Sequence, residues 1–472
     1  MLTLADLLKA LTGLQIEGAS LIISEASIDS RQVIPASLFV ALPGERVDGH
    51  DYVGTAFNRG ANLALVQKDL STQFAQVDLS SGDWKPGYKL PAPPFCIRVD
   101  DSLVAFQKIA AYWRAQLSLR VIGITGSVGK STTKELVAEV LSQRYHTLRN
   151  TGNLNNEIGL PLTLLRLTEA HQRAVLEMGF YVPGEIDFLC KMAKPQIGVV
   201  TNIGTVHAER AGSQEAIARG KAELIQALPA DGVAILNHDD PWVRGMAEQT
   251  KAHVLFYGLT PEANLWADNI ESLGLEGIRF CLHWGNESVH MRVPLIGRHS
   301  VHTALRAAAV ALVEGLTWQE IGDGLTHSRS QLRLVAVHTQ NGALLLDDTY
   351  NASPESTLAS LNLLGELSGR RVAVLGDMYE LGQYELQGHF MVGARAAEVC
   401  SELVAVGKLG KLIAEAAQQS GLPAYAVTWV ETIPEAIELL KVKLRPGDVA
   451  LVKGSHGLRM DRIINALEVE AE

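Results

Sequence analysis

The chain has 472 residues, of which 47% are hydrophobic and 20% charged, so two or three globular domains are expected. Its formal net charge is −11 and its basic residues form no cluster, which argues against nucleic acid as the main partner. No apolar run is long enough to cross a membrane, and the first residues lack the pattern of a secretion signal. Four scattered cysteines suit reduced thiols, so we expect a cytoplasmic protein with no membrane partner.

The first region, residues 1–101, is predicted to form one unit. A short helix at 3–11 precedes strand-like segments at 37–42 and 62–66. Polar segments at 29–31 and 44–50 are typical of turns between them. Residues 68–94 contain Pro, Gly, Ser and Asp with little periodicity, and we interpret them as a surface insertion.

A helical pattern at 102–117 leads to the segment 121–133, which reads VIGITGSVGKSTT. Strand, glycine-rich turn and helix form the arrangement in which backbone N–H groups and a helix N-terminus bind phosphate. Lys130 can then reach the outer phosphates, and the Ser131 hydroxyl can hold Mg²⁺. The loop is shorter than usual, because Ile124 stands where the common pattern has its first glycine. Rather than an ordinary strand-to-helix turn, we predict an ATP site formed by Thr125, Gly126, Ser127, Val128, Gly129, Lys130, Ser131 and Thr132.

The second region, residues 102–328, continues with β-rich runs at 174–178, 197–204 and 233–237 that alternate with helical patterns. This alternation predicts a mainly parallel sheet with helices on both faces, and ligands in such sheets lie beyond the carboxyl ends of the strands. Residues 261–294 are predicted to form an antiparallel excursion at the sheet edge, followed by an alanine-rich helix at 303–314.

The third region, residues 329–472, repeats the alternation. The pattern restarts near 328–334 and has strand-like runs at 343–348, 371–377, 402–407 and 448–455. It contains no Gly-x-Gly-x-x-Gly, so no motif marks it as a dinucleotide site.

Several polar residues follow predicted strands of the second region. Glu177 ends one strand, where a carboxylate can bind Mg²⁺ directly or through water. His207 follows another strand, and its interpretations as a metal ligand and as a structural histidine are equally open. Lys221 begins a helical pattern, where a lysine is ordinarily a solvated charge.

Two further clusters are unusual. Asn153, Asn155 and Asn156 suit a turn and also offer amide groups to a polar substrate. Asp347 and Asp348 follow a strand, and adjacent carboxylates repel each other unless a cation, an ammonium group or a ribose lies nearby. Ser353 with Ser356 suits the cap of the helix that follows.

Together these segments resemble the Mur ligase family of ATP-dependent amide-bond-forming enzymes over nearly the whole chain. The resemblance depends on residues 29–31, 37–42, 48–50, 125–133, 152–161, 177–179, 207, 220–223, 237–240, 347–354, 375–378, 380–382, 389 and 453–455. The aspartate pair with Tyr-Asn-Ala-x-Pro and the string Gly-Asp-Met-x-Glu-Leu-Gly are typical of the member that adds D-alanyl-D-alanine. The chain departs from the family pattern at Thr303, Ser353 and His456, where the family usually has Asn, Asn and Arg.

The resemblance implies an α/β protein of three domains. These are an N-terminal α/β UDP-substrate domain (1–101), a central parallel-sheet phosphate-loop ATPase domain (102–328) and a C-terminal Rossmann-like domain (329–472). It implies a monomer that joins D-alanyl-D-alanine to UDP-N-acetylmuramoyl-tripeptide through an acyl phosphate, with ATP and Mg²⁺, in peptidoglycan precursor synthesis.

The resemblance also assigns roles to residues. Lys130, Glu177, His207 and Lys221 would be catalytic, and Ser131, Glu177, His207 and a carbamate of Lys221 would serve the metal. Further contacts to the nucleotide would come from Asn237, Asp240, Asp347 and Asn351. Contacts to the UDP substrate would come from Ser30, Arg31, His50, Asn153, Asn155 and Asn156.

Two alternative functions stay open at this point. One is a sister ligase with another amine or acceptor, such as a folylpolyglutamate-synthetase-like enzyme, although segment 29–50 belongs to a UDP-sugar domain. The other is a nucleotide-dependent scaffold without enzymatic activity, against which the intact Lys130, Ser131, Glu177 and His207 argue.

Overall fold

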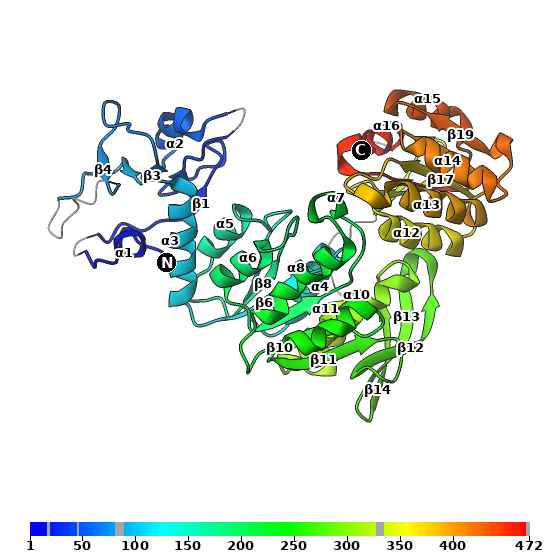
Figure 1. Cartoon of the computed structure of the whole chain (residues 1–472), viewed down its shortest axis with the longest axis horizontal. Helices are drawn as coiled ribbons and strands as arrows, with labels where there is room; N and C mark the ends of the chain where they lie inside the picture. The colour runs from blue at the N-terminus through cyan, green and yellow to red at the C-terminus, as the bar shows by residue number, and fades with distance from the viewer. Residues whose placement is uncertain (17–18, 45–46, 81–88, 327–334, 469–472) are drawn as a thin grey trace. The chain divides into compact units, whose positions relative to one another are not determined.

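The computed structural model describes residues 1–16, 19–44, 47–80, 89–326 and 335–468 (Figure 1). Its strands form sheets of five, nine and six strands. The chain divides into two compact units: the first contains 1–123, 145–179 and 185–196, and the second contains 124–144, 180–184 and 197–472. No helix in the described part of the chain combines the length and the apolar character needed to span a membrane.

The N-terminal sheet belongs to the first unit and has the strand order β1-β2-β3-β5-β4, all pairs parallel. Its strands are β1 (Ala26–Ser27), β2 (Leu38–Val40), β3 (Leu63–Val66), β4 (Gln76–Asp78) and β5 (Phe95–Arg98). The helices of this region are α1 (Leu4–Thr12), α2 (Val53–Asn58) and α3 (Ser102–Gln116). Part of the segment 68–94, which we interpret as a surface insertion, belongs to this sheet, because β4 lies within it and pairs with β5. Residues 81–88 of that segment lie outside the described residues.

Other elements of the first unit come from the second region of the sequence. They are β7 (Thr147–Arg149), β8 (Arg173–Glu177), α5 (Gly159–Leu165) and α6 (Glu185–Ala193), and β7 pairs in parallel with β8. Strand β6 (Arg120–Thr125) contributes residues to both units, since the division falls after Gly123.

The second unit contains the remaining strands of the central sheet, in the order β14-β13-β12-β11-β10-β9. They are β9 (Ile197–Val200), β10 (Val233–Asn237), β11 (His253–Gly258), β12 (Leu265–Ser272), β13 (Ile278–Trp284) and β14 (Glu287–Val293). The helices are α4 (Lys130–Leu141), α7 (Ala208–Ala211), α8 (Gln214–Gln226), α9 (Pro241–Arg244), α10 (Val301–Val313) and α11 (Trp318–Thr326). Strands β9 to β12 pair in parallel, whereas β12, β13 and β14 pair antiparallel, so the predicted antiparallel excursion is confirmed.

The C-terminal sheet, also in the second unit, has the order β15-β16-β20-β17-β18-β19. Its strands are β15 (Val335–His338), β16 (Leu344–Asp348), β17 (Arg370–Gly376), β18 (Glu402–Val406), β19 (Val427–Val430) and β20 (Asp448–Lys453). Helices α12 (Pro354–Glu366), α13 (Glu385–Val399) and α14 (Gly410–Gln419) share one buried cluster with the sheet. Helices α15 (Ile433–Lys443) and α16 (Asp461–Leu467) share a second cluster on the opposite face (Figure 1).

The C-terminal region therefore has helices on both faces of a mainly parallel sheet, as the alternating pattern predicts. The predicted α/β class is confirmed. The segment 328–334, where we expect the pattern to restart, lies outside the described residues.

Candidate nucleotide site

The phosphate loop connects β6 to α4 and is held by the residues that follow β9. Ser127 N–H donates to the Asn202 carbonyl at 2.9 Å, and Val128 N–H donates to Asn202 Oδ1 at 2.9 Å. Thr201 Oγ1 donates to the Val128 carbonyl at 2.7 Å. Gly126 has φ +143°, and a Cβ at this position would lie 1.9 Å from Thr201 Oγ1, so only glycine fits. The loop therefore has one defined shape, which ends at the N-terminus of α4.

Lys130 begins α4, and its side chain returns over this loop. Its Nζ donates to the Gly126 carbonyl at 2.8 Å and to the Ser127 carbonyl at 3.3 Å. Ser131 and Thr132 occupy the first turn of the same helix, where backbone N–H groups favour an anion. The predicted strand, turn and helix thus bring Lys130 and Ser131 to one helix N-terminus.

Lys221 lies in the middle of α8, and only 1% of the residue is exposed. A solvated charge, which is the ordinary role of a lysine in a helix, therefore does not describe Lys221. Its Nζ donates to the Gly126 carbonyl at 3.1 Å and lies 4.7 Å from the centre of the Phe180 ring. Burial, and then the charge of Lys130, lower the pKa of Lys221 well below that of an ordinary lysine.

The contact between Phe180 and Lys221 depends on Gly220. A Cβ at Gly220 would lie 2.0 Å from Cε2 of Phe180. Only glycine therefore allows the Phe180 ring to reach Lys221, and the apolar ring favours the neutral amine.

His207 precedes α7 with φ +68°, in the left-handed region. Its Nδ1 lies 2.6 Å from Glu380 Oε2, and its ring packs edge-on against Tyr181. Burial, and then the charges of Lys130 and Lys221, lower the pKa of His207, so its ring is neutral near pH 7. With the proton on Nδ1 bonded to Glu380, Nε2 keeps its lone pair. Nothing in the sequence alone indicated this role for Glu380, which comes from a distant segment.

Asn237, the last residue of β10, and Asp240, which follows this strand, both have hydrogen-bond partners within the chain. Asn237 Nδ2 donates to the Thr201 carbonyl at 3.0 Å. Asp240 Oδ1 accepts from Trp242 N and Val243 N at the start of α9, and Oδ2 accepts from Ile203 N at 2.8 Å. Both residues therefore brace the segment after β9 that also holds the phosphate loop.

Arg306 is a candidate residue that our sequence reasoning missed. It is buried on α10, and its Nη2 donates to Thr303 Oγ1 at 2.8 Å. A Cβ at Gly129 would lie 3.2 Å from Nη2, so the guanidinium lies beside the phosphate loop. Within the described ranges its Nε has no hydrogen-bond partner. A buried arginine with a free donor beside this loop suits a phosphate oxygen.

In the first unit, Glu177 ends β8 and is 2% exposed. Its Oε1 accepts from Asn155 Nδ2 at 2.9 Å. Its backbone N–H donates to Oδ1 of the buried Asn150, a residue that sequence reasoning missed. Asn156 Oδ1 accepts from Gly159 N at the start of α5, and Asn153 accepts from Asn155 N through its carbonyl. The asparagine cluster therefore orients Glu177 and starts a helix.

The predicted UDP-substrate residues 30, 31 and 50 also lie in the first unit. Ser30 is buried, and the exposed Arg31 pairs with Asp29 at 2.8 Å. His50 is buried, with Nδ1 2.6 Å from Asp48 Oδ1, and its Nε2 accepts from Gln67 N at 3.0 Å. Both ring nitrogens of His50 thus have protein partners, and contacts of these residues to UDP stay a prediction.

The aspartate pair lies at the end of β16. Asp348 Oδ2 lies 2.6 Å from Nζ of the buried Lys453 and accepts from Ser360 Oγ. Lys453 also donates to the Asn351 carbonyl at 3.0 Å. Asp347 Oδ1 accepts from Thr349 N and Oγ1, and Ser353 caps α12 as predicted. An ammonium group within the chain therefore explains why the two carboxylates are tolerated side by side.

These features define a class of protein. A parallel sheet, a glycine-rich loop before α4, and Lys130 followed by Ser131 at the start of that helix are the properties of a phosphate-loop nucleotide-binding α/β protein.

Comparison with models of protein families identifies the family within this class. The Mur ligase middle domain matches residues 124–311. The glutamate ligase domain of Mur ligases matches 332–456, and the Mur ligase family catalytic domain matches 22–89. This chain belongs to the Mur ligase family.

Individual relatives agree with this assignment. The UDP-N-acetylmuramoyl-tripeptide–D-alanyl-D-alanine ligase of Escherichia coli is 35% identical, over 99% of this chain and 98% of its own. The protein of that name from Bacillus subtilis is 34% identical over 94% and 93%. Among solved structures, MurF from Acinetobacter baumannii has a TM-score of 0.83 at 30% identity, covering 98% of both chains. MurF ligase from Thermotoga maritima in complex with ADP has a TM-score of 0.78 at 25% identity, covering 94% and 97%.

Proposed function

We propose that this chain is an ATP-dependent ligase that joins D-alanyl-D-alanine to UDP-N-acetylmuramoyl-tripeptide in peptidoglycan precursor synthesis. The full-length similarity to relatives that carry this name is the observation on which the proposal mainly depends. The geometry of the phosphate loop, with Lys130 at its end, supports the use of ATP. We further propose that the ligase acts in the cytoplasm as a monomer.

Each proposed domain would bind a different part of the substrates. Residues 1–101 would bind the UDP moiety through Ser30, Arg31 and His50, and residues 102–328 would bind ATP. Residues 329–472 would contribute Asp347 and Asn351 to the nucleotide and bring the dipeptide. Asn237 and Asp240 would contact the nucleotide from the second region, and Asn153, Asn155 and Asn156 would contact the UDP substrate.

The reaction has two steps. A carboxylate oxygen of the tripeptide attacks the γ-phosphorus of ATP, and the bond from that phosphorus to the β–γ bridging oxygen breaks, which gives an acyl phosphate and ADP. The amine of D-alanyl-D-alanine then attacks the acyl carbon, phosphate leaves and the amine loses a proton. The main obstacle is the approach of two anions, and Lys130 and Arg306 offer positive charge at the loop.

Each of the three residues that we propose as ligands of a magnesium ion carries a suitable donor atom. Ser131 offers a hydroxyl, and Glu177 offers a buried carboxylate that Asn155 orients. His207 would present Nε2, because its Nδ1 is bonded to Glu380. When bound, Mg²⁺ supplies charge that neutralises phosphate oxygens.

Lys221 would complete this set as a carbamate. Its amine is neutral at lower pH than that of an ordinary lysine, because it is buried beside Lys130 and Phe180. A neutral amine adds to CO₂ and loses one proton, so Lys221 becomes an anion with two oxygen donors. Burial, the main cause of the lowered pKa, is therefore also the feature that prepares this chemistry.

The first experiment is a substrate-dependence assay. Purified protein is incubated with Mg²⁺, ATP and UDP-N-acetylmuramoyl-tripeptide, and phosphate is measured with and without D-alanyl-D-alanine, with the product identified by mass. We expect phosphate release that requires both substrates and a pentapeptide product. Release with a single amino acid or another acceptor instead would assign a sister activity. ATP binding without release for any acceptor would favour the scaffold.

A further inference from the structure

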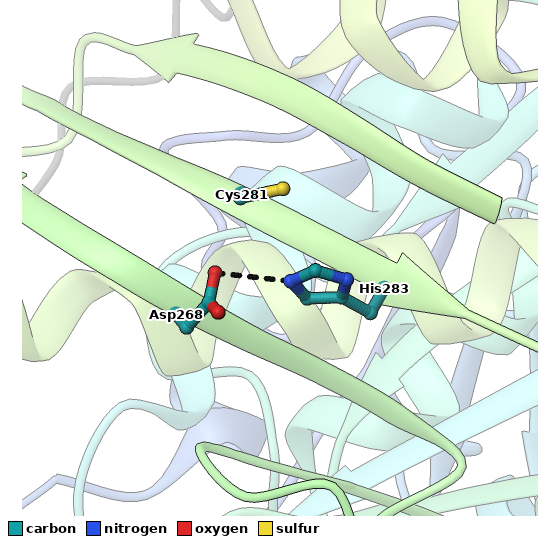
Figure 2. A group of neighbouring side chains, drawn as sticks. All are labelled: Asp268, Cys281 and His283. Carbon is teal, nitrogen blue, oxygen red and sulfur yellow. Dashed lines mark hydrogen bonds and ion pairs between the residues drawn. The ribbon is translucent and has the colours of Figure 1, made fainter. Parts of the chain in front are cut away.

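Three side chains with metal-binding atoms meet on β12 and β13, in elements that the proposed reaction does not use. Asp268 on β12 pairs directly with Cys281 on β13, and Trp266 pairs with His283. Paired residues of antiparallel strands, and residues two apart on one strand, share a face of the sheet. Figure 2 shows the three side chains on that face, and their ligand atoms lie within 4.8 Å of one another.

The ring of His283 is held in one orientation. Its Nε2 lies 3.0 Å from Asp268 Oδ1, and its Nδ1 lies 2.8 Å from Ser288 Oγ on β14. Trp266 stacks on the ring, with centroids 3.9 Å apart and planes at 14°. Metal-bound histidines characteristically have their second nitrogen hydrogen-bonded in this way, which fixes the ring and the tautomer.

The strand pairing becomes irregular directly after Asp268. The β12–β13 register shifts between Asp268 and Glu271, and Asn269 in this bulge has φ +50°. A bulge changes the direction in which neighbouring side chains point. On the third strand, His290 pairs directly with Cys281 and is exposed.

Sulfur, nitrogen and carboxylate oxygen together suit a particular kind of ion. Mg²⁺ and Ca²⁺ prefer oxygen donors, whereas Zn²⁺ accepts a thiolate, an imidazole and a carboxylate in one tetrahedral site. We propose that Asp268, Cys281 and His283 bind Zn²⁺, with His290 or water as the fourth ligand. This site goes beyond the proposed ligase activity and would fasten β12 to β13.

Binding requires a defined movement of protons. Burial and the charge of Asp268 raise the pKa of Cys281, so the free thiol carries its proton. On binding, that proton is released and the sulfur becomes a thiolate ligand. The single proton of the neutral His283 ring then resides on Nδ1, where Ser288 Oγ accepts it, and Nε2 donates its lone pair to the metal.

The test uses the full chain, treated with a chelator and returned to buffer with excess Mg²⁺, which fills sites that prefer hard cations. Co²⁺ is added as a spectroscopic probe, and Zn²⁺ affinity is measured by competition with it. We expect one equivalent of Co²⁺ with a thiolate-to-cobalt charge-transfer band. Cys281→Ser should abolish the band, and Asp268→Asn and His283→Gln should weaken affinity more than tenfold.

Two further variants distinguish the effect of orienting the His283 ring from effects of substitution elsewhere on the sheet. Ser288→Ala should weaken affinity by about 10–100-fold, as the loss of an outer hydrogen bond to a metal-bound histidine does. His253→Gln, on an exposed histidine at the start of β11, should leave affinity unchanged.

The proposal is overturned if wild-type protein gives no charge-transfer band, or if the band persists in Cys281→Ser. Circular dichroism verifies that each variant is folded. If Cys281→Ser does not fold, Asp268→Asn decides, because its side chain is 41% exposed and its removal leaves the strand pairing intact. An unchanged affinity in Asp268→Asn would then contradict the site. These measurements need no substrate, so they are independent of the ligase assay.

Discussion

Lys221 and Lys453 are both almost completely buried in the second unit, yet their surroundings are opposite. Lys453 lies 2.6 Å from Asp348 and donates to a carbonyl, so its charge is compensated within the chain. Lys221 contacts the Gly126 carbonyl and an aromatic ring, with the charge of Lys130 nearby. The comparison indicates that burial alone does not define a lysine's role. Lys453 is a fixed cation that supports the fold, whereas the lowered pKa of Lys221 suits the carbamate that we propose.

The largest expected effect is on stability at Lys453. Lys453→Met leaves the Asp348 carboxylate, whose side chain is only 14% exposed, without its cation, and we expect the free energy of unfolding to fall by about 3–5 kcal/mol. Urea denaturation measures this. Lys441→Met, which removes an exposed lysine paired with Glu438, should change it by about 0.5 kcal/mol or less. Equal effects of the two variants would contradict the structural role of Lys453.

The next effect is on activity at Lys221. Lys221→Ala removes the proposed carbamate, and we expect kcat to fall by about 10²–10³-fold, the usual loss for one electrostatic group in an active site. Added bicarbonate or formate should restore part of the rate by supplying a carboxylate to the vacated space. Lys251→Ala, at an exposed lysine of the same region, serves as the control. A loss below threefold, or no rescue, would remove the carbamate from the proposal.

The dependence of stability on pH provides a further test of the difference between Lys221 and Lys453. The pKa of Lys221 is lowered in the folded chain, so between that pKa and the unfolded value the unfolded chain binds more protons. The free energy of unfolding therefore rises with pH in this window, by up to about 1.4 kcal/mol per pH unit. Lys221→Met should lack this contribution in CO₂-free urea denaturation from about pH 7 to about pH 10. Parallel curves for wild type and variant would contradict the lowered pKa.

The smallest effect is expected at Asp347. In Asp347→Asn the amide oxygen can still accept from Thr349, so the free energy of unfolding should change by about 0.5 kcal/mol or less. If Asp347 contacts the nucleotide, the KM for ATP should rise about two- to tenfold, the value of one hydrogen bond. A KM equal to that of wild type would leave Asp347 with its turn-forming role alone.

The sequence predicted well whatever depends on local pattern. The alternation of strands and helices, the Ser353 cap and the phosphate loop all arise from residues close together in the chain. It did not predict features that depend on distant segments. The residues around Lys221 in the sequence do not single it out, because nothing nearby indicates that the Phe180 ring covers it. Arg306 beside Gly129, and Glu380 on His207, likewise bring separate elements together.

The same reasoning applies to β4. A three-residue strand between polar segments has too few residues to show a period of two, and only its pairing with β5 reveals it. The aspartate pair could be predicted only in part. Its repulsion indicated that a cation was needed, but the sequence did not indicate that Lys453 supplies it.

The close approach of Gly220 to Phe180 also has an evolutionary consequence. Any side chain at position 220 would collide with the ring, and loss of the ring would open the apolar cover of Lys221. We therefore expect each single substitution to be selected against, so that the two positions are inherited together. Lineages of this enzyme are expected to keep the pair or to replace both members together.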